Sequence, residues 1–254
     1  MNRVKKIKEF WNERAMQYGA NQEATLGEIA VRYLEINEIN RHLDHGKKIL
    51  DVGCGNGYTT KIFAKNYKSK IFGIDYSPEM IKIAKQNIVR SETLGEVKFN
   101  VQNCLDLNYQ NNYFDVIYTE RCIQNLPELK LQEQAILELL RVLKPGGKLI
   151  LVECSKTGLL KLNKIRKMIG RTEINDAEPW HNKFFDDNWI IEFTHKNKDI
   201  FRLEIKHFAS TYTFLTRILP LWRLFYYSRY FQYVPNIGEF GYFKSFIILK
   251  SKDK

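Results

Sequence analysis

The sequence of 254 residues has only four cysteines and five histidines, and their spacing excludes the common metal and disulfide frameworks. Cys54, Cys104, Cys122 and Cys154 form no C-x-x-C pair, and no histidines stand at H-x-x-x-H or H-E-x-x-H spacing. No stretch reaches the roughly 18 consecutive apolar residues of a transmembrane helix, and the N-terminal bases precede no apolar run. We therefore expect no metal, no spanning helix, no secretory signal and a reducing, cytoplasmic location.

Acidic residues are scarce in the C-terminal part of the chain. The net charge is +11, with 22 bases and 19 acids in residues 1–153 but 18 bases and 10 acids in residues 154–254. An apolar fraction of 44% excludes an intrinsically disordered protein. The sequence therefore predicts a folded protein whose later part faces an anionic partner.

Short apolar runs alternate with segments of helical period from residue 47 onward, as in a parallel α/β sheet. Before that point, helical spacing predicts a helical pair within residues 4–43. The expected strands cover residues 48–52, 70–74, 97–101, 114–119, 148–152, 201–208 and 244–250. The expected helices between them cover residues 58–67, 78–89, 129–143 and 186–194. We expect one domain over 1–254, made of a helical cap (1–46), a cofactor-binding core (47–155) and an acceptor-side half (156–254), with insertions at 154–172 and 210–243.

The first expected strand runs into a glycine-rich turn, Gly53-Cys54-Gly55-Asn56-Gly57. Glycines let the backbone turn sharply and approach a ligand closely. Tyr58 stands where a dinucleotide-binding motif needs its third glycine, so a pyrophosphate ligand is not expected. Asp51, just before the turn, would repel a phosphate and attract an ammonium or sulfonium group.

Polar residues end the next two strands. Asp75 follows the second strand, where a carboxylate can accept both hydroxyls of a ribose. Asn103 follows the third, where its amide can pair with the exocyclic amine and a ring nitrogen of adenine.

Five segments resemble, in order and spacing, the motifs of class I S-adenosylmethionine-dependent methyltransferases of the small-molecule type. They are residues 50–57, 73–80, 101–107, 114–117 and 141–147. The resemblance implies a Rossmann-like, doubly wound α/β sheet of seven strands, one of them antiparallel, and S-adenosyl-L-methionine as cofactor. It also implies cofactor contacts from Tyr18, Asp51, Gly53, Cys54, Gly55, Asp75, Tyr76, Met80, Asn103, Cys104, Leu105, Thr119 and Glu120.

Two details qualify this resemblance. The family most often has Asp where Asn103 stands, and Asn keeps the carbonyl acceptor for the adenine amine. In the entry helix before the core, Trp11 is expected to anchor the core and Tyr18 to contact the cofactor. A second interpretation is a related domain whose glycine turn and carboxylates serve only packing and capping, which would require five ordered motifs to coincide.

The acceptor site should lie beyond strands four and five. Similar enzymes often carry a His pair where this chain has Gln124 and Asn125, so the usual base is missing. We expect His181 to replace it, because an imidazole with a near-neutral pKa can take a hydroxyl proton; a surface or capping histidine is the other interpretation. Glu120 is the second catalytic candidate, and an ion pair with Arg121 its alternative. The expected acceptor contacts are Arg121, Gln124, Trp180, His181 and Tyr212.

The two insertions have unusual compositions. Residues 154–172 carry six bases, no acid and an apolar stripe at helical spacing. Residues 210–243 hold 12 of the 34 aromatic residues, with three arginines and one acid, and residues 210–217 loosely resemble methyltransferases of bacterial surface-polysaccharide gene clusters. These features favour an anionic, amphiphilic or lipid-linked acceptor met at an anionic membrane surface. Their alternative is packing over the sheet edge with solvated bases.

Four functions follow from these patterns. The first is O-methylation of a small, amphiphilic, saccharide or lipid-linked acceptor, and the second is C-methylation of a quinone-like or prenylated ring. RNA methylation or RNA binding ranks below both, because the Asn-Pro-Pro-Tyr type of motif is absent at residues 119–122. The fourth is a cofactor-binding regulatory protein without catalysis. The sequence indicates no oligomeric state.

Overall fold

The computed structural model describes residues 3–89, 91–175, 182–219 and 221–252. Its sheet has the strand order β3-β2-β1-β4-β5-β7-β6. The strands are β1 (Lys48–Val52), β2 (Lys70–Asp75), β3 (Glu96–Val101), β4 (Phe114–Glu120), β5 (Leu143–Cys154), β6 (Phe201–Lys206) and β7 (Phe243–Lys250). The helices are α1 (Arg3–Tyr18), α2 (Ile29–Asn40), α3 (Tyr58–Asn66), α4 (Pro78–Val89), α5 (Leu129–Val142), α6 (Lys156–Met168), α7 (Asp187–Lys196), α8 (Ser210–Thr213) and α9 (Trp222–Phe225). Short helical turns are η1 (Gln22–Ala24), η2 (Ile123–Asn125), η3 (Phe214–Ile218) and η4 (Arg229–Tyr233).

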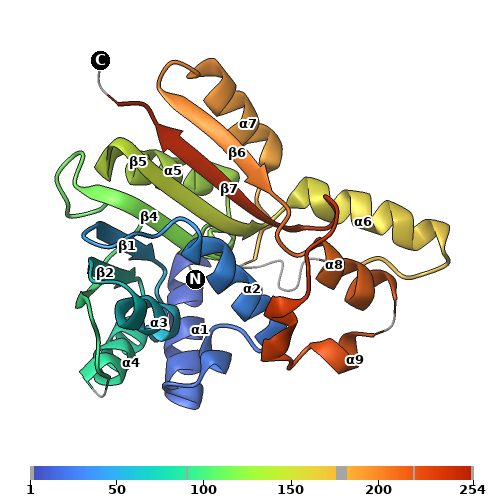
Figure 1. Ribbon diagram of the computed structural model, residues 1–254, viewed down its shortest axis with the longest axis horizontal. Coiled ribbons are helices and arrows are strands. Elements are labelled where there is room, and N and C mark those ends of the chain that lie inside the picture. Colours follow the sequence, from blue (N-terminus) through green and yellow to red (C-terminus); the bar gives the residue numbers. More distant parts are fainter. Residues whose placement is uncertain (1–2, 90, 176–181, 220, 253–254) are drawn as a thin grey trace.

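The predicted α/β sheet of seven strands is confirmed, with β7 as its antiparallel strand (Figure 1). β1 pairs in parallel with β2 and β4, whereas β7 pairs antiparallel with both β5 and β6. β1 and β4 are almost entirely buried, which explains why apolar residues stand next to each other in both strands, as in Ile49-Leu50 and Val116-Ile117, rather than alternating with polar ones. The expected turn at residues 145–147 lies within β5, where the register with β4 shifts.

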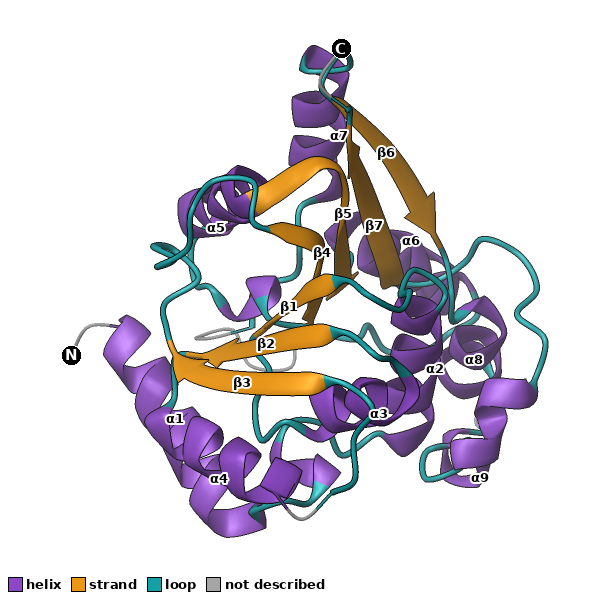
Figure 2. Cartoon of the chain, turned by 60° about the vertical axis from the view of Figure 1, so that its left-hand side comes forward, coloured by secondary structure: helices purple, strands orange, loops and turns teal. Residues whose placement is uncertain are grey.

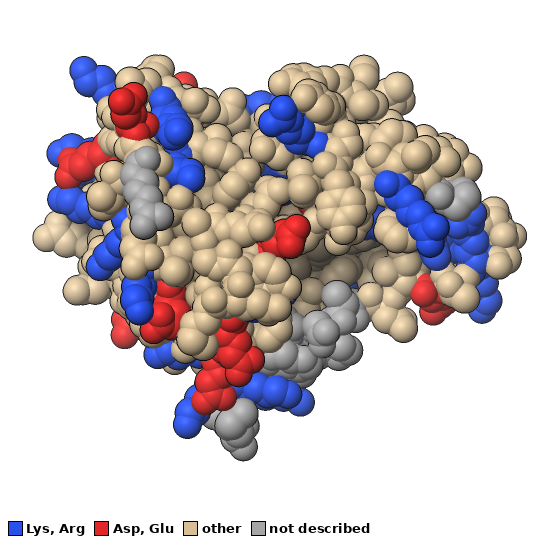
Figure 3. Space-filling view, turned by 90° about the horizontal axis from the view of Figure 1, so that it is seen from below, with Lys and Arg blue, Asp and Glu red and all other residues tan. Residues whose placement is uncertain are grey.

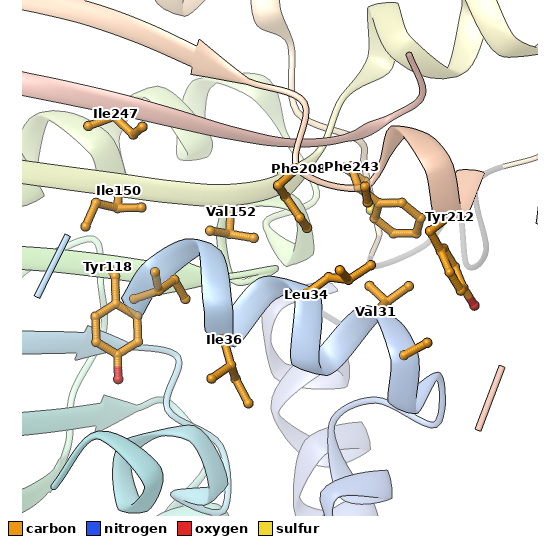
Figure 4. Close-up of a cluster of buried hydrophobic side chains, with 14 of the residues drawn as sticks. Val31, Leu34, Ile36, Tyr118, Ile150, Val152, Phe208, Tyr212, Phe243 and Ile247 are labelled. Carbon is orange, nitrogen blue, oxygen red and sulfur yellow. The ribbon is translucent and has the colours of Figure 1, made fainter. Parts of the chain in front are cut away.

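Helices cover both faces of the sheet (Figure 2). On one face, α2, α3 and α6 pack against alternate strand residues such as Ile49 and Ile150. On the other, α5 and α7 pack against their neighbours, Leu50 and Leu149. Figure 4 shows α2 beneath the first of these faces, with Val31 and Leu34 among the buried side chains. The core therefore consists of two apolar layers with the sheet between them.

The N-terminal helical pair is also confirmed, but its helices occupy different places. α1 packs against α4 through Ala15 and Met80, beside the ends of β1 and β2, whereas α2 lies on the sheet face. The insertions form helices: Ser155 caps α6 by accepting a hydrogen bond from the Gly158 N–H, and α8, η3, α9 and η4 follow β6. No helix in the described ranges is both long and apolar enough to cross a bilayer.

Candidate active site

A pocket of about 420 Å³ opens at the carboxyl ends of β1, β2 and β4. The strand order reverses between β1 and β4, which is where ligands bind in doubly wound sheets. α1 forms the opposite wall of this pocket with residues including Ile7 and Trp11. Of the predicted site residues, those lining the pocket are Gly53, Gly55, Asp75, Tyr76, Met80, Asn103, Cys104, Leu105, Glu120, Arg121 and Gln124.

The glycine turn is held tightly against its surroundings. Gly53, Gly55 and Gly57 all have positive φ, from 53° to 74°. A Cβ at Gly53 would lie 2.6 Å from Cys122 Sγ, and one at Gly55 would lie 2.5 Å from Thr25 Cγ2. Side chains at these positions would therefore be strained and would displace the pocket wall.

Asp75 points both of its carboxylate oxygens at backbone donors beside the pocket. Oδ2 accepts from the Gly55 N–H at 2.9 Å, and Oδ1 accepts from the Ser77 N–H at 2.8 Å. Desolvation raises the pKa of Asp75 to about 6, despite these hydrogen bonds that lower it. Each carboxylate oxygen has a second lone pair, so the side chain can still accept two hydroxyl donors from a ligand.

Four predicted cofactor residues do not line the pocket. Asp51 is 2% exposed and accepts from the Thr60 hydroxyl, and burial raises its pKa to about 7. Thr119 is buried and donates to Glu153 Oε1 at 2.7 Å, and Cys54 is buried in the core. The Tyr18 ring packs 4.3 Å from the guanidinium carbon of Arg14. The structure brings Trp11 to the pocket wall in place of Tyr18.

Glu120 lies between the pocket and a buried arginine. Its side chain is 6% exposed, pairs with Arg32 from α2 and accepts from the Thr59 hydroxyl at 2.7 Å. Burial alone would raise the pKa of Glu120, but Arg32 and Arg121 hold it below its ordinary value. The carboxylate is therefore ionised near neutral pH.

A second buried contact between an arginine and a carboxyl group stands next to the first. Arg121 Nε lies 3.1 Å from Glu35 Oε1, and Glu35 is 1% exposed. Burial raises the pKa of Glu35 well above its ordinary value. Arg121 itself has φ of 53°, unusual for a residue other than glycine, and its N–H donates to the Val152 carbonyl at 2.8 Å. Such strain is concentrated at functional sites.

Glu153 anchors the loop after β4 that forms one pocket edge. It accepts from the Ile123 and Gln124 N–H groups, both at 3.1 Å. Burial raises the pKa of Glu153 to about 7. Gln124 in turn donates to Asn182 Oδ1 at 2.7 Å, and Asn182 also lines the pocket. This contact brings the segment after residue 181 to the site.

The other three predicted acceptor residues are Trp180, His181 and Tyr212. Trp180 and His181 lie outside the described residues. Tyr212 is fully buried in the core, does not line the pocket and donates its hydroxyl to Glu28. Within the described ranges, no three His, Cys, Asp or Glu side chains gather as metal ligands.

Residues that line the pocket but were missed from the sequence come mainly from α1 and from loops. They are Val4, Ile7, Lys8, Phe10, Trp11, Arg14, Thr25, Val52, Ile74, Ser77, Gln102, Cys122, Asn125, Leu126, Pro127 and Asn182. In the sequence, α1 was marked as a pocket wall only by the aromatic residues Trp11 and Tyr18, and such residues are equally typical of a helix that packs on the core. Arg32 and Glu35 behind the wall gave no signal, because charged residues on a helix ordinarily face water.

Comparison with known proteins identifies the family. Residues 43–199 match the model of a family described as "Methyltransferase domain". The chain is 32% identical over 117 residues to a demethylmenaquinone methyltransferase of Lactiplantibacillus plantarum, covering 45% of this chain and 48% of that protein. It is 26% identical over 188 residues to the ubiquinone/menaquinone biosynthesis C-methyltransferase UbiE of Stutzerimonas stutzeri, covering 70% and 72%. The first of these matches thus spans about half the length of the relative.

The fold is also that of phosphoethanolamine N-methyltransferase 1 from Haemonchus contortus, whose structure contains phosphoethanolamine and S-adenosylhomocysteine. The TM-score is 0.65 at 15% identity, covering 99% of this chain and 49% of that one. At this identity the likeness shows the fold alone. On the family match over residues 43–199, the chain belongs to the S-adenosylmethionine-dependent methyltransferases.

Proposed function

We propose that this methyltransferase acts on a small amphiphilic acceptor through an acidic hydroxyl group, and that Glu120 receives the proton. The observation that carries the proposal is an ionised carboxylate in a pocket whose acceptor side is otherwise largely apolar. The cofactor supplies an electrophilic methyl group on a sulfonium when it is bound. The protein then has to align the acceptor, exclude water and hold the proton.

The cofactor half of the pocket is assigned to residues on the β1, β2 and β3 side. Asp75 would hold the ribose hydroxyls with its two remaining lone pairs. Asn103 and Leu105 would lie beside the adenine, and the open surface of Gly53 and Gly55 would face the methionyl part. These residues fit the cofactor, because a Cβ at either glycine would close the cradle and Asp75 keeps its acceptor capacity.

The acceptor half is assigned to α1 and the loop after β4. Its walls include Phe10, Trp11, Leu126 and Pro127, which favour a ring or an aliphatic group over a free saccharide. Arg121 and Gln124 would orient the polar end of such an acceptor. The apolar walls support an amphiphilic molecule whose reactive hydroxyl points toward Glu120.

The ion pair with Arg32 limits how basic Glu120 can be. A carboxylate with a lowered pKa is a poor acceptor for the proton of an alkyl alcohol, but a phenol-like hydroxyl, with a pKa near 10, is far more acidic. This difference supports a ring hydroxyl as the reacting group. The methyl group would end on that oxygen.

C-methylation is the second candidate, and a specific observation favours it. Loss of a ring hydroxyl proton also makes the neighbouring ring carbon nucleophilic. When that carbon takes the methyl group from the sulfonium, S-adenosylhomocysteine leaves, and the ring carbon then gives up its own hydrogen as a proton while the oxygen is protonated again. The names of the two curated relatives concern menaquinone and ubiquinone, which are ring compounds. Identification of the methylated atom in the product by nuclear magnetic resonance separates O-methylation from C-methylation.

The proposal is tested by methyl transfer from labelled S-adenosylmethionine to hydroxylated aromatic acceptors of increasing hydrophobicity. We expect Glu120→Gln to lower kcat while S-adenosylhomocysteine binding stays near the wild-type value. His181→Ala is the comparison, because His181 remains the alternative base. Loss of turnover in His181→Ala with normal turnover in Glu120→Gln would assign the proton to the histidine and contradict the proposal.

A further inference from the structure

The two insertions carry most of the large apolar side chains that the protein exposes. Of the 21 such side chains in the described residues, 13 lie in residues 156–175 and 210–243. Several are among the most exposed, with Met168 at 77%, Tyr233 at 76% and Leu224 at 69%. The thirteen, which we name the cap face, are Leu160, Ile165, Met168, Ile169, Phe214, Leu219, Trp222, Leu224, Tyr227, Tyr230, Tyr233, Val234 and Ile237. A concentration of this kind marks an interaction site.

α6 shows that this exposure is not the edge of a core. Leu159 and Leu162 of α6 are buried against the sheet, so one face of this helix already packs in the core. Leu160 and Met168 lie on the opposite, outward face, together with lysines rather than acids. A solvated helix face ordinarily carries mixed charges.

The charge around the cap face is predominantly positive. Its exposed cations are Lys156, Lys161, Lys164, Lys167, Arg223 and Arg229. Glu173 and Glu239 are the acids in the described residues of these two segments. Apolar and basic side chains with few acids are the composition of a surface that binds anionic lipid.

The two segments lie together at one end of the molecule. Arg166 of α6 donates to the Arg217 carbonyl in η3, and Figures 1 and 2 both place α8 between α6 and α9. Figure 3 shows Lys and Arg side chains gathered near the end at which Figure 1 places α6 and α9, beside mostly uncharged surface. The two segments that carry the cap face are therefore in contact with each other at α6 and η3.

We propose that the cap face docks on an anionic lipid bilayer, which deepens the proposed function by supplying the amphiphilic acceptor from the membrane. Tyr and Trp side chains prefer the interface between lipid and water, and lysines reach from it to anionic headgroups. A second copy of the chain is the less favoured occupant, because it would bring two surfaces of the same positive sign together.

Vesicle binding tests this docking directly. Cosedimentation is measured with vesicles of phosphatidylglycerol and phosphatidylcholine, and with phosphatidylcholine alone, at low and high salt. We expect binding to the anionic vesicles at low salt, weakened at high salt. The triple variant Lys161→Gln, Lys164→Gln, Lys167→Gln should bind on the order of 100-fold more weakly.

Two controls isolate the cap face. The variant Lys85→Gln, Lys130→Gln, Lys198→Gln removes the same charge from exposed lysines elsewhere and should bind like wild type. Leu224→Ser should weaken binding roughly tenfold or more, whereas Leu137→Ser, at an exposed leucine on α5, should not. S-adenosylhomocysteine binding should be normal in all four variants, because none of the changed residues lines the pocket.

The outcomes separate this proposal from the proposed function. Equal vesicle binding by the two lysine variants, or no binding by the wild type, would overturn docking. A concentration-dependent dimer that Leu224→Ser dissociates would assign the cap face to a second copy instead. If methyl transfer to amphiphilic acceptors persists without vesicle binding, only the docking fails; if vesicles bind but no such acceptor is methylated, only the proposed function fails.

Discussion

Gly53→Ala and Gly46→Ala form a matched pair that measures how closely the cofactor turn packs on the loop after β4. Both glycines have φ of 74°, so alanine pays the same backbone cost at each position, about 1 kcal/mol. Gly46 has nothing within 4 Å of the added Cβ. At Gly53 the added Cβ would lie 2.6 Å from Cys122 Sγ and 2.7 Å from Cys122 Cβ. Only Gly53→Ala adds a steric cost.

Overpacking of this kind costs typically about 1–3 kcal/mol. We therefore expect the free energy of unfolding to fall by about 1 kcal/mol in Gly46→Ala and by about 2–4 kcal/mol in Gly53→Ala. Gly53 also lines the pocket, so S-adenosylhomocysteine should bind more weakly to Gly53→Ala and normally to Gly46→Ala.

Urea unfolding gives the free energies, and isothermal calorimetry gives the affinities. Equal losses of stability in the two variants would refute the reasoning, because the close approach of Gly53 to Cys122 would then have no energetic effect. Normal cofactor affinity in Gly53→Ala would likewise refute the position of the turn in the pocket wall.

Three further predictions concern carboxylates. Asp75→Asn should weaken S-adenosylhomocysteine binding about 10- to 100-fold by calorimetry, because one carboxylate oxygen loses its acceptor role. In the wild type, the affinity should decrease when the pH is lowered past about 6, the pKa of Asp75. An unchanged affinity in the variant would contradict the assignment. Glu120→Gln should lower kcat about 100-fold or more with little change in KM, whereas Glu79→Gln, on the exposed side of α4, should not. Asp51 has a folded pKa raised from 3.8 to about 7, so its protonated form stabilises the fold below a pH of about 4 and that contribution is lost as the pH rises through 7. The wild-type free energy of unfolding should therefore decline by up to about 4 kcal/mol between pH 4 and pH 7 on account of Asp51, and Asp51→Asn should lack this part of the decline. Parallel curves of unfolding free energy against pH for the variant and the wild type would count against it.

Strands and turns of the core could be predicted because their signals are local. β1 carries adjacent apolar residues and leads into glycines whose positive φ only that residue adopts without strain, so the turn could be predicted from the sequence. Asp75 ends β2 and Asn103 follows β3, and the carboxyl ends of parallel strands meet at one edge of the sheet. Those two residues were therefore predicted near the pocket without any knowledge of packing.

The residues that form and support the pocket walls could not be predicted, because they are set by tertiary contacts that leave no local signal in the sequence. Trp11 and Tyr18 lie seven residues apart on one face of α1, and only the position of this helix along the pocket decides that Trp11 lines it and Tyr18 does not. Arg32 and Glu35 on α2 are buried because each faces an opposite charge from β4 or the residue after it. Tyr212 resembled a site residue, but the carboxylate of Glu28 holds its hydroxyl in the core.

The most direct test of the proposed function is transfer of labelled methyl groups from S-adenosylmethionine to cell-extract fractions separated into lipid, glycan and nucleic acid. The site geometry predicts label in the lipid fraction with the wild-type protein, and loss of that label with Asp75→Asn and Glu120→Gln. Label confined to the glycan or nucleic-acid fraction would contradict an amphiphilic acceptor.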